Sequence, residues 1–248
     1  MKDDVFAGSI PEIYERILVP FMFEPFAEDL ASRVGTARRI LEIAAGTGIL
    51  TRKLAAKLPS AHIVATDLNT PMIDRARALL PGVEWKQADA QKLPFADGSF
   101  DVAVCQFGAM FFPDRAGAYR EARRVAGRFV MSTWGPLATH TVENAVIQSL
   151  AKLLPDAPPR FLERTPHGYH DPKIVRADLE AAGFTKIAID EVRLRGRARS
   201  SRELAIGYCQ GTPLRNEIPP GRLEEVTNAL AAMLPVEGDM LAWVATAS

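Results

Sequence analysis

Residues 39–48 read RILEIAAGTG, a short apolar run that ends in a glycine-rich turn. Such a run is typical of a strand buried on both faces of a parallel sheet. Gly46 and Gly48 permit a tight turn and let the backbone approach a ligand closely, although an ordinary strand-to-helix turn can contain the same pair. The stretch predicts a strand that enters a helix, and the surrounding residues must decide whether the turn binds a ligand.

The segments that follow repeat this alternation of strand and helix. Short apolar runs predict strands at residues 61–67, 83–87, 100–105 and 129–133, and capped segments predict helices at residues 51–58, 71–80 and 114–125. Asp114 is the expected N-cap of the last of these helices. This order, with its short connections, predicts an α/β fold with a parallel sheet covered on both faces. In such sheets ligands lie at the carboxyl ends of the strands, beside the topological switch point.

The two ends of the chain are mainly helical. Residues 9–34 predict two helices separated by a break at Pro20 and Pro25, the second running from Phe26 to Val34. Beyond Pro136 the pattern predicts helices at 138–154, 172–182 and 201–234, the last broken at 211–213 and 219–221, with a loop over 155–170. Residues 186–194 and 240–245 predict two more strands.

The residues around the turn distinguish between ligands. A phosphate-binding P-loop needs a Gly-Lys-Ser/Thr ending that the chain lacks, and a dinucleotide turn has a small third residue where this chain has Thr51. Glu42, four residues before Gly46, would repel a pyrophosphate but suits the ammonium of an amino acid. S-adenosylmethionine (SAM) carries that ammonium and no phosphate, so the turn matches SAM better than NAD or a nucleoside triphosphate.

Further polar residues follow the next strands. Asp67 is placed to accept both hydroxyls of a ribose, or alternatively to cap a helix. Leu68 and Met72 could sandwich an adenine, although Met72 alone would fit a core position equally well. Asp89 could hold the adenine amine beside the Ala90 amide, or be an ordinary loop residue.

The motif order resembles that of the class I SAM-dependent methyltransferases. The motifs are Glu-x-Ala-x-Gly-x-Gly at 42–48, the strand-end Asp67, Ala-Asp-Ala at 88–90 and LPFADGSFD at 93–101. Within that class, residues 38–134 are most similar to the type 11 group, which includes the ubiquinone and menaquinone biosynthesis enzymes. The resemblance implies a Rossmann-like, seven-stranded, mostly parallel sheet with one antiparallel strand and a helical cap. It also implies SAM as the cofactor. The resemblance and the residue patterns together give the following candidate contacts: Tyr14, Glu42, Ala44, Gly46, Thr47, Gly48, Asp67, Leu68, Met72, Asp89, Ala90, Cys105 and Gln106.

The chain departs from the family pattern in two places. The turn over residues 124–128 is shorter than the usual Pro-Gly-Gly type, for which we expect altered packing rather than lost activity. The fourth strand ends Cys105-Gln106-Phe107-Gly108, without an Asn-Pro-Pro-Tyr-like motif. That ending disfavours methylation of an amide or a nucleobase nitrogen.

We expect a single methyltransferase domain over residues 1–248. Its predicted parts are an N-terminal lid (1–35), a SAM-binding core (36–135), cap insertions (136–170 and 200–235) and the remaining core elements (171–199 and 236–248). An aromatic-rich cap without basic excess favours a small, fairly apolar acceptor. If the acceptor must lose a proton, histidine is the usual base, and the cap supplies the candidates His140, His167 and His170.

Aromatic side chains near the predicted site have two interpretations. Tyr14, Phe21, Phe23 and Phe26 could form a lid over SAM or ordinary core packing of an N-terminal helix. Phe111 and Phe112 could likewise line the acceptor pocket or pack against the following helix. His62 lies at the start of a strand and is expected to be structural.

Composition limits the remaining possibilities. The 248 residues carry a formal net charge of zero, so we expect no nucleic-acid partner, and the alternating Arg193, Arg195, Arg197 and Arg199 predict the solvent face of a strand. Two cysteines without zinc spacing predict no metal site and a reducing cytoplasm. The N-terminus lacks the apolar core of a signal peptide, and no apolar stretch is long enough for a transmembrane helix. We therefore expect a cytoplasmic monomer or homodimer.

The alternatives are a non-catalytic SAM-binding protein and an NAD-dependent oxidoreductase, the latter disfavoured by Glu42 and Thr51.

Overall fold

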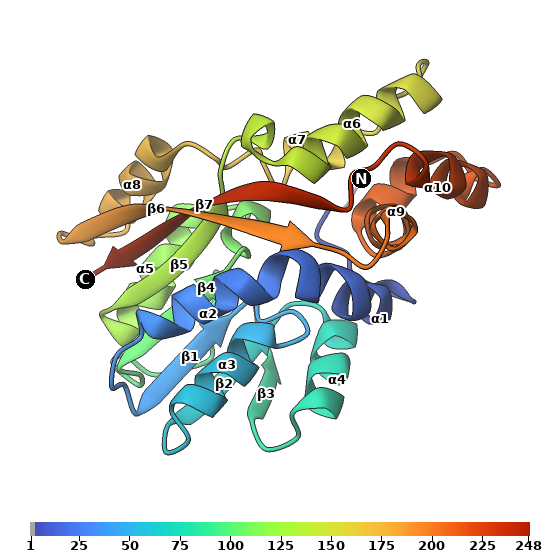
Figure 1. Ribbon diagram of the computed structural model, residues 1–248. Coiled ribbons are helices and arrows are strands. Elements are labelled where there is room, and N and C mark those ends of the chain that lie inside the picture. Colours follow the sequence, from blue (N-terminus) through green and yellow to red (C-terminus); the bar gives the residue numbers. More distant parts are fainter. Residues whose placement is uncertain (1–2) are drawn as a thin grey trace.

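The computed structural model describes residues 3–248, and the first two residues of the predicted N-terminal lid (1–35) lie outside this part. A single seven-stranded sheet runs through the molecule in the order β3-β2-β1-β4-β5-β7-β6 (Figure 1). The strands are β1 Arg39–Ile43, β2 His62–Asp67, β3 Glu84–Gln87, β4 Val102–Gln106, β5 Phe129–Trp134, β6 Ile187–Arg197 and β7 Glu237–Ala247. Strands β1 to β5 pair in parallel, and β7 is antiparallel to both β5 and β6. The predicted mixed sheet with one antiparallel strand is confirmed.

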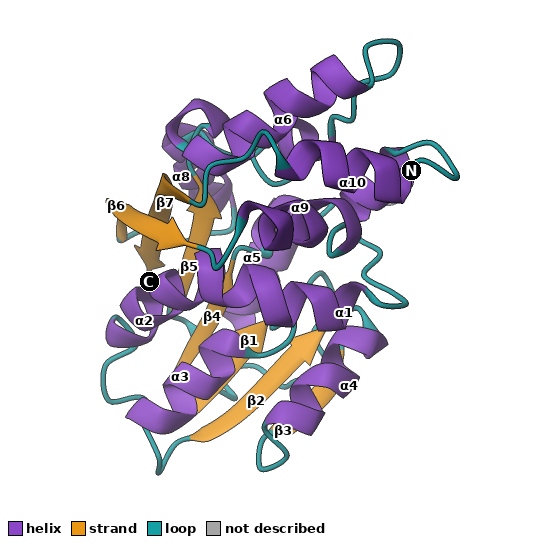
Figure 2. Ribbon diagram, turned by 45° about the vertical axis from the view of Figure 1, so that its right-hand side comes forward, coloured by secondary structure: helices purple, strands orange, loops and turns teal. Residues whose placement is uncertain are grey.

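Both faces of the sheet are covered by helices (Figure 2). Helices α2 (Glu24–Ser32), α3 (Ile49–Lys57) and α4 (Thr70–Leu79) pack on one face, and α5 (Arg115–Ala126) and α8 (Pro172–Ala181) pack on the other. Strand β1 carries apolar side chains on both faces, since Ile40 faces the α2–α3 side while Leu41 and Ile43 face the α5 side. The order of strands reverses between β1 and β4, which places the switch point at the end of the glycine-rich strand.

The N-terminal helical segment is continuous, which corrects the predicted break at the two prolines. Helix α1 (Ile10–Ile13) leads into a π-helical stretch, η1 (Tyr14–Phe23), and then into α2. Pro20 lies within the π-helical stretch and Pro25 at the start of α2. The change from π-helical to α-helical hydrogen bonding between Phe23 and Glu24 accommodates the two prolines, neither of which can donate a backbone hydrogen bond, without interrupting the segment.

Four helices gather beyond the carboxyl ends of the parallel strands (Figure 1). They are α6 (Thr141–Leu153), α7 (Phe161–Arg164), α9 (Ser201–Gln210) and α10 (Leu223–Ala231), accompanied by the short 3-10 turns η3 (Leu137–Thr139) and η4 (Pro213–Glu217). Contacts join α10 to α6 and α9, α7 to η4, and α9 to η1. We call these four helices the helical cap.

Most predicted elements are found within a few residues of their expected bounds. Asp114 accepts a hydrogen bond from the Gly117 N–H and caps α5, as expected. The arginines from Arg193 to Arg197 are exposed on the edge strand β6, also as expected. Helix α7 was missed within the predicted 155–170 loop. Its first N–H groups, those of Arg160 and Phe161, are capped by the carboxylate of Glu217, a residue too distant in sequence for a local pattern to reveal.

Candidate functional site

A cavity of about 320 Å³ opens at the carboxyl ends of β1, β2, β3 and β4. This is the position at which open α/β sheets bind ligands, and the volume suits a small molecule. Its polar wall contains Glu42 from the end of β1, Asp67 from the end of β2 and Asp89 after β3. Gln106, the last residue of β4, lies at the cavity and donates its side-chain N–H to the Phe23 carbonyl at 2.7 Å.

The turn after β1 is held open by left-handed backbone conformations. Ala44, Gly46 and Gly48 have φ angles of 56°, 57° and 82°. Gly48 is further constrained by packing, because a Cβ atom there would lie 2.5 Å from the Trp85 ring. Gly46 lines the cavity, whereas Gly48 packs behind it. The two glycines therefore have different roles, one exposing backbone to the cavity and the other allowing helix α3 to approach Trp85.

Glu42 is a buried carboxyl group, 1% exposed, at the edge of the cavity. One of its oxygens accepts a 2.5 Å hydrogen bond from the hydroxyl of Thr51. Thr51 occupies the third position of the glycine-rich turn, so this bond gives the unusual threonine a function in holding the carboxyl group. Burial raises the pKa of Glu42 to about 8, and the Thr51 hydrogen bond partly opposes that rise.

The carboxylate of Asp67 is oriented by the backbone around it. One oxygen accepts the Gly46 N–H at 2.8 Å, and the other accepts the Asn69 N–H at 2.8 Å. The side chain is 7% exposed and lines the cavity. Burial raises its pKa despite these hydrogen bonds. Asp67 thus ties the turn after β1 to the end of β2 while keeping its carboxylate at the cavity surface.

Aromatic side chains cover the cavity on the side of the N-terminal segment. Phe6, Tyr14, Phe23 and Phe111 line it. Their rings contact one another, with centroid separations of 6.3 Å for Phe6–Tyr14, 5.7 Å for Phe6–Phe111 and 4.9 Å for Tyr14–Phe23. Phe6 is fixed further by its N–H, which donates to the side chain of Asn69. Phe21 and Phe26 are buried in the core, which agrees with core packing, the second of the two interpretations of this aromatic cluster.

A second, smaller cavity of about 70 Å³ lies between the sheet and the helical cap. It shares five aromatic residues with the larger cavity: Phe6, Tyr14, Phe23, Phe107 and Phe111. Phe107 is a non-glycine residue with a φ of 51°, and its ring stacks on Trp134 at a centroid distance of 3.4 Å. The cap side of this cavity is apolar except for Glu143, His167, Tyr208 and Thr212. The two cavities therefore adjoin across an aromatic partition, with polar groups at the far end.

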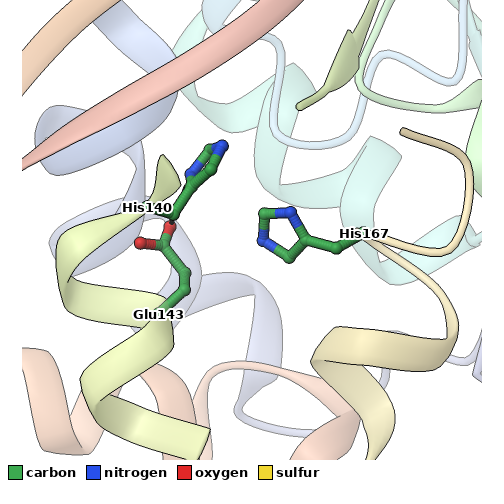
Figure 3. A group of neighbouring side chains, drawn as sticks. All are labelled: His140, Glu143 and His167. Carbon is green, nitrogen blue, oxygen red and sulfur yellow. Dashed lines mark ion pairs between the residues drawn. The ribbon is translucent and has the colours of Figure 1, made fainter. Parts of the chain in front are cut away.

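The polar end of the second cavity is a cluster of three buried side chains, His140, Glu143 and His167 (Figure 3). Their exposed fractions are 0%, 1% and 3%. Burial lowers the pKa of His167 to about 4, so its ring is neutral near pH 7. Burial acts to raise the pKa of Glu143, but the neighbouring His140 holds it below its usual value. His170 lies outside both cavities, exposed, with its ring nitrogen on the His167 carbonyl.

Comparison with known proteins identifies the family. A model of the methyltransferase domain matches residues 40–127. The demethylmenaquinone methyltransferase of Thermus thermophilus is 33% identical over 164 residues, which cover 60% of this chain and 74% of that protein. The chain belongs to the class I SAM-dependent methyltransferases. SAM is therefore its cofactor, and the chain is an enzyme of the ubiquinone and menaquinone methyltransferase-like group.

Two further comparisons agree with this assignment. The ubiquinone/menaquinone biosynthesis C-methyltransferase UbiE of Ectopseudomonas mendocina is 35% identical over 132 residues, covering 50% of this chain and 48% of that protein. The aligned region thus spans about half the length of this relative. A crystal structure from Anabaena variabilis, described as a methyltransferase of an antibiotic biosynthesis pathway, superimposes with a TM-score of 0.67 at 17% identity, covering 92% of this chain and 98% of the other. That likeness concerns the fold alone.

Most residues predicted to contact SAM lie at the larger cavity of this methyltransferase. The ones that line it are Tyr14, Glu42, Ala44, Gly46, Asp67, Leu68, Met72, Asp89, Ala90 and Gln106. Thr47, Gly48 and Cys105 do not line it. Thr47 and Cys105 are 1% and 0% exposed, and Gly48 packs on Trp85. These three residues therefore contribute to the site through the course of the backbone and place no side chain at the cavity.

Two features of the methyltransferase site were not predicted from the sequence. Phe6 and Asp4 line the larger cavity; they fall within the predicted N-terminal lid (1–35) but before its first predicted helix, and neither was predicted as a site residue. Glu143 lies three residues after His140 in a predicted helix and was not predicted as a site residue. The available signal was the His-x-x-Glu spacing, because residues three apart share one side of a helix.

Proposed function

We propose that this methyltransferase binds SAM in the larger cavity and transfers its methyl group to a small, largely apolar acceptor in the second cavity. The observation that carries the proposal is the position of Glu42 and Asp67 at one cavity, with a separate apolar cavity adjoining it through a shared aromatic wall. A methyl donor and its acceptor require two such adjoining spaces. The predicted division into lid, core and cap accords with this arrangement, since the second cavity lies against cap residues.

The larger cavity offers a group for each part of SAM. Glu42, held by Thr51, would accept the amino-acid ammonium, and Asp67 would accept the ribose hydroxyls. Leu68 and Met72 line the cavity where the adenine would be sandwiched, and Asp89 with the Ala90 amide would hold its polar edge. These contacts fix the donor, which leaves the sulfonium methyl free to face the aromatic partition.

Transfer then needs positioning more than proton chemistry. The nucleophilic atom of the acceptor forms a bond to the methyl carbon as the carbon–sulfur bond breaks in line, and S-adenosylhomocysteine leaves with the electron pair. Holding the two reactants within near-attack distance supplies much of the acceleration. Of the histidines predicted to act on the acceptor, we retain His140 and His167, which lie in the polar cluster at the second cavity, and withdraw His170, which lies away from it.

The acceptor is best sought among compact aromatic molecules. The cavity walls are mainly phenylalanine, leucine and methionine side chains, which favour apolar rings. Two relatives are named for methylation in quinone biosynthesis, so short-chain quinols are the first acceptors to test. The experiment is SAM-dependent turnover against quinols, phenols, amines and lipids, with S-adenosylhomocysteine as the measured product. Turnover of one compact aromatic class is expected, and SAM binding without turnover of any member would favour a non-catalytic SAM-binding protein.

A further inference from the structure

The cluster of His140, Glu143 and His167 holds more lone pairs than the surrounding protein can satisfy. His140 immediately precedes α6, Glu143 is in its first turn, and His167 follows α7 in the chain. One ligand atom from each residue lies within 4.8 Å of those of the other two. In Figure 3 the rings of His140 and His167 lie on either side of a space that the Glu143 carboxylate also approaches.

His167 presents an unprotonated nitrogen to this space. Its Nδ1 atom lies 2.9 Å from the Gly135 carbonyl oxygen, which can only accept a hydrogen bond. Nδ1 therefore carries the proton, and Nε2 of the neutral ring keeps its lone pair. Figure 3 shows a ring nitrogen of His167 turned toward Glu143 and His140.

His140 is fixed in the complementary manner. Its Nε2 atom lies 2.9 Å from the Leu241 carbonyl oxygen and 3.3 Å from the Leu241 N–H. A proton on Nε2 satisfies the closer of these two contacts, the one to the carbonyl oxygen. The other nitrogen, Nδ1, is buried, has no hydrogen-bond partner among residues 3–248, and lies 3.7 Å from Glu143 Oε1. Both histidines thus donate one ring N–H to a backbone carbonyl and aim the other nitrogen at the same space, as metal-ligating histidines usually do.

Glu143 completes the set. Both of its carboxylate oxygens are buried and form no hydrogen bond of normal length within the described part of the chain, with the His140 ring and the Tyr208 hydroxyl as the neighbouring polar groups. A buried carboxylate without a partner is strongly unfavourable, so a positive species must compensate it. A proton on His140 would compensate the charge only in part, because 3.7 Å exceeds hydrogen-bond length and the His167 nitrogen would remain unpaired.

We propose that His140, Glu143 and His167 bind one divalent transition-metal ion, through His140 Nδ1, His167 Nε2 and the Glu143 carboxylate. Two imidazoles and a carboxylate are a donor set suited to Zn²⁺ or Fe²⁺ rather than to Mg²⁺ or Ca²⁺. Ligand atoms around such an ion lie about 3.4 Å apart, given bonds of about 2.1 Å. The ligand atoms of the three residues lie within 4.8 Å of one another, and small side-chain rotations would bring them to this spacing.

The ion would have an open position toward the second cavity. Glu143 and His167 both line that cavity, and three protein ligands leave at least one coordination position free. An acceptor oxygen bound there would lose its proton more readily, because a metal ion lowers the pKa of a coordinated hydroxyl. This consequence favours phenol- or enol-type acceptors and rests on the proposed function, whereas the metal binding itself does not.

Metal binding is tested on the full chain without SAM or acceptor. Zn²⁺ and Co²⁺ are titrated calorimetrically into protein treated with a chelator, and Co²⁺ binding is also followed by its visible d–d absorption. We expect one ion per chain, with affinity reduced more than tenfold in Glu143→Gln and His167→Ala. His62→Ala, which removes an exposed histidine on β2, should leave the affinity unchanged. If the wild-type chain bound these metal ions no more tightly than Glu143→Gln does, the proposed metal site would be wrong.

A measurement on the wild-type chain alone covers the case in which a variant fails to fold. Heteronuclear NMR of the histidine ring nitrogens should show Zn²⁺ shifting His140 Nδ1 and His167 Nε2, while His62 and His170 remain unaffected. Equal shifts at all four histidines, or none, would contradict the proposal. SAM affinity measured in parallel separates this result from the proposed function. The chain can bind SAM without binding a metal ion, and it can bind a metal ion without binding SAM.

Discussion

Replacing Glu42 by Gln should stabilise the free protein as the pH rises while weakening SAM binding. In the folded chain the pKa of Glu42 rises from 4.5 to about 8, primarily because the carboxyl group is buried. The folded state therefore binds more protons than the unfolded state between those values, and its stability falls as the pH rises through this window. Gln cannot ionise, so the variant avoids that loss.

The size of the effect follows from the two pKa values. The change from 4.5 to about 8 corresponds to about 5 kcal/mol of unfolding free energy once the pH exceeds 8, and to about 3 kcal/mol at pH 7. Near pH 5 the wild type and Glu42→Gln should differ by less than about 1 kcal/mol. The stability advantage of the variant should therefore increase with pH and level off above 8.

Urea unfolding at pH 5, 7 and 9 measures this dependence, with Glu84→Gln, on the exposed part of β3, as the matched control. The second arm is SAM calorimetry, where Glu42→Gln should bind more weakly because the ammonium loses its charged partner. Wild-type binding should release protons near pH 7, since the bound ammonium favours the ionised carboxylate. An unfolding free energy with the same pH dependence in wild type and Glu42→Gln would refute the reasoning.

Three further changes test the remaining contacts. Asp67→Ala should weaken SAM at least tenfold, as expected on losing hydrogen bonds to a charged group, and unchanged affinity by calorimetry would rule out the ribose assignment. Thr51→Val should raise the pKa of Glu42 further by removing a hydrogen bond, which moves the rise in SAM affinity to higher pH. The control is Thr47→Val, because the buried Thr47 hydroxyl has no hydrogen-bond partner in the described part of the chain, and equal pH profiles in the two variants would contradict this expectation. Gly48→Ala should lower the free energy of unfolding by about 1–3 kcal/mol, measured in urea, because of the Gly48 φ of 82° and its contact with Trp85. Gly82→Ala, where a Cβ meets open space, should lower it less. Equal decreases in the two variants would show that packing on Trp85 is not the cause.

The core of the fold and the cofactor end of the site were predictable because their determinants are local. Glu42, Gly46 and Thr51 lie within ten residues of one another, so their spacing alone indicates the class of ligand. The alternation of strands and helices likewise indicated a parallel sheet covered on both faces.

The acceptor end depends on contacts between distant segments. Glu143 meets His167 only because α6 and the segment after α7 converge, and helix α7 itself is capped by Glu217 from η4. Pro20 was misinterpreted because the penalty for proline in an α-helix does not apply in the same way to a π turn. Phe6 reaches the cavity through a hydrogen bond to Asn69, 63 positions away, which no window of sequence reveals.

None of the helices that the structure describes is long and apolar enough to cross a bilayer.

Calorimetric titration of the chain with SAM and, separately, with NADH tests the central claim most directly. The polar groups at the larger cavity, an acidic Glu42 where a pyrophosphate would lie and Asp67 beside Gly46, predict one SAM bound per chain at least tenfold more tightly than NADH. Binding of NADH as tight as that of SAM, or SAM affinity unchanged in Asp67→Ala, would contradict the account.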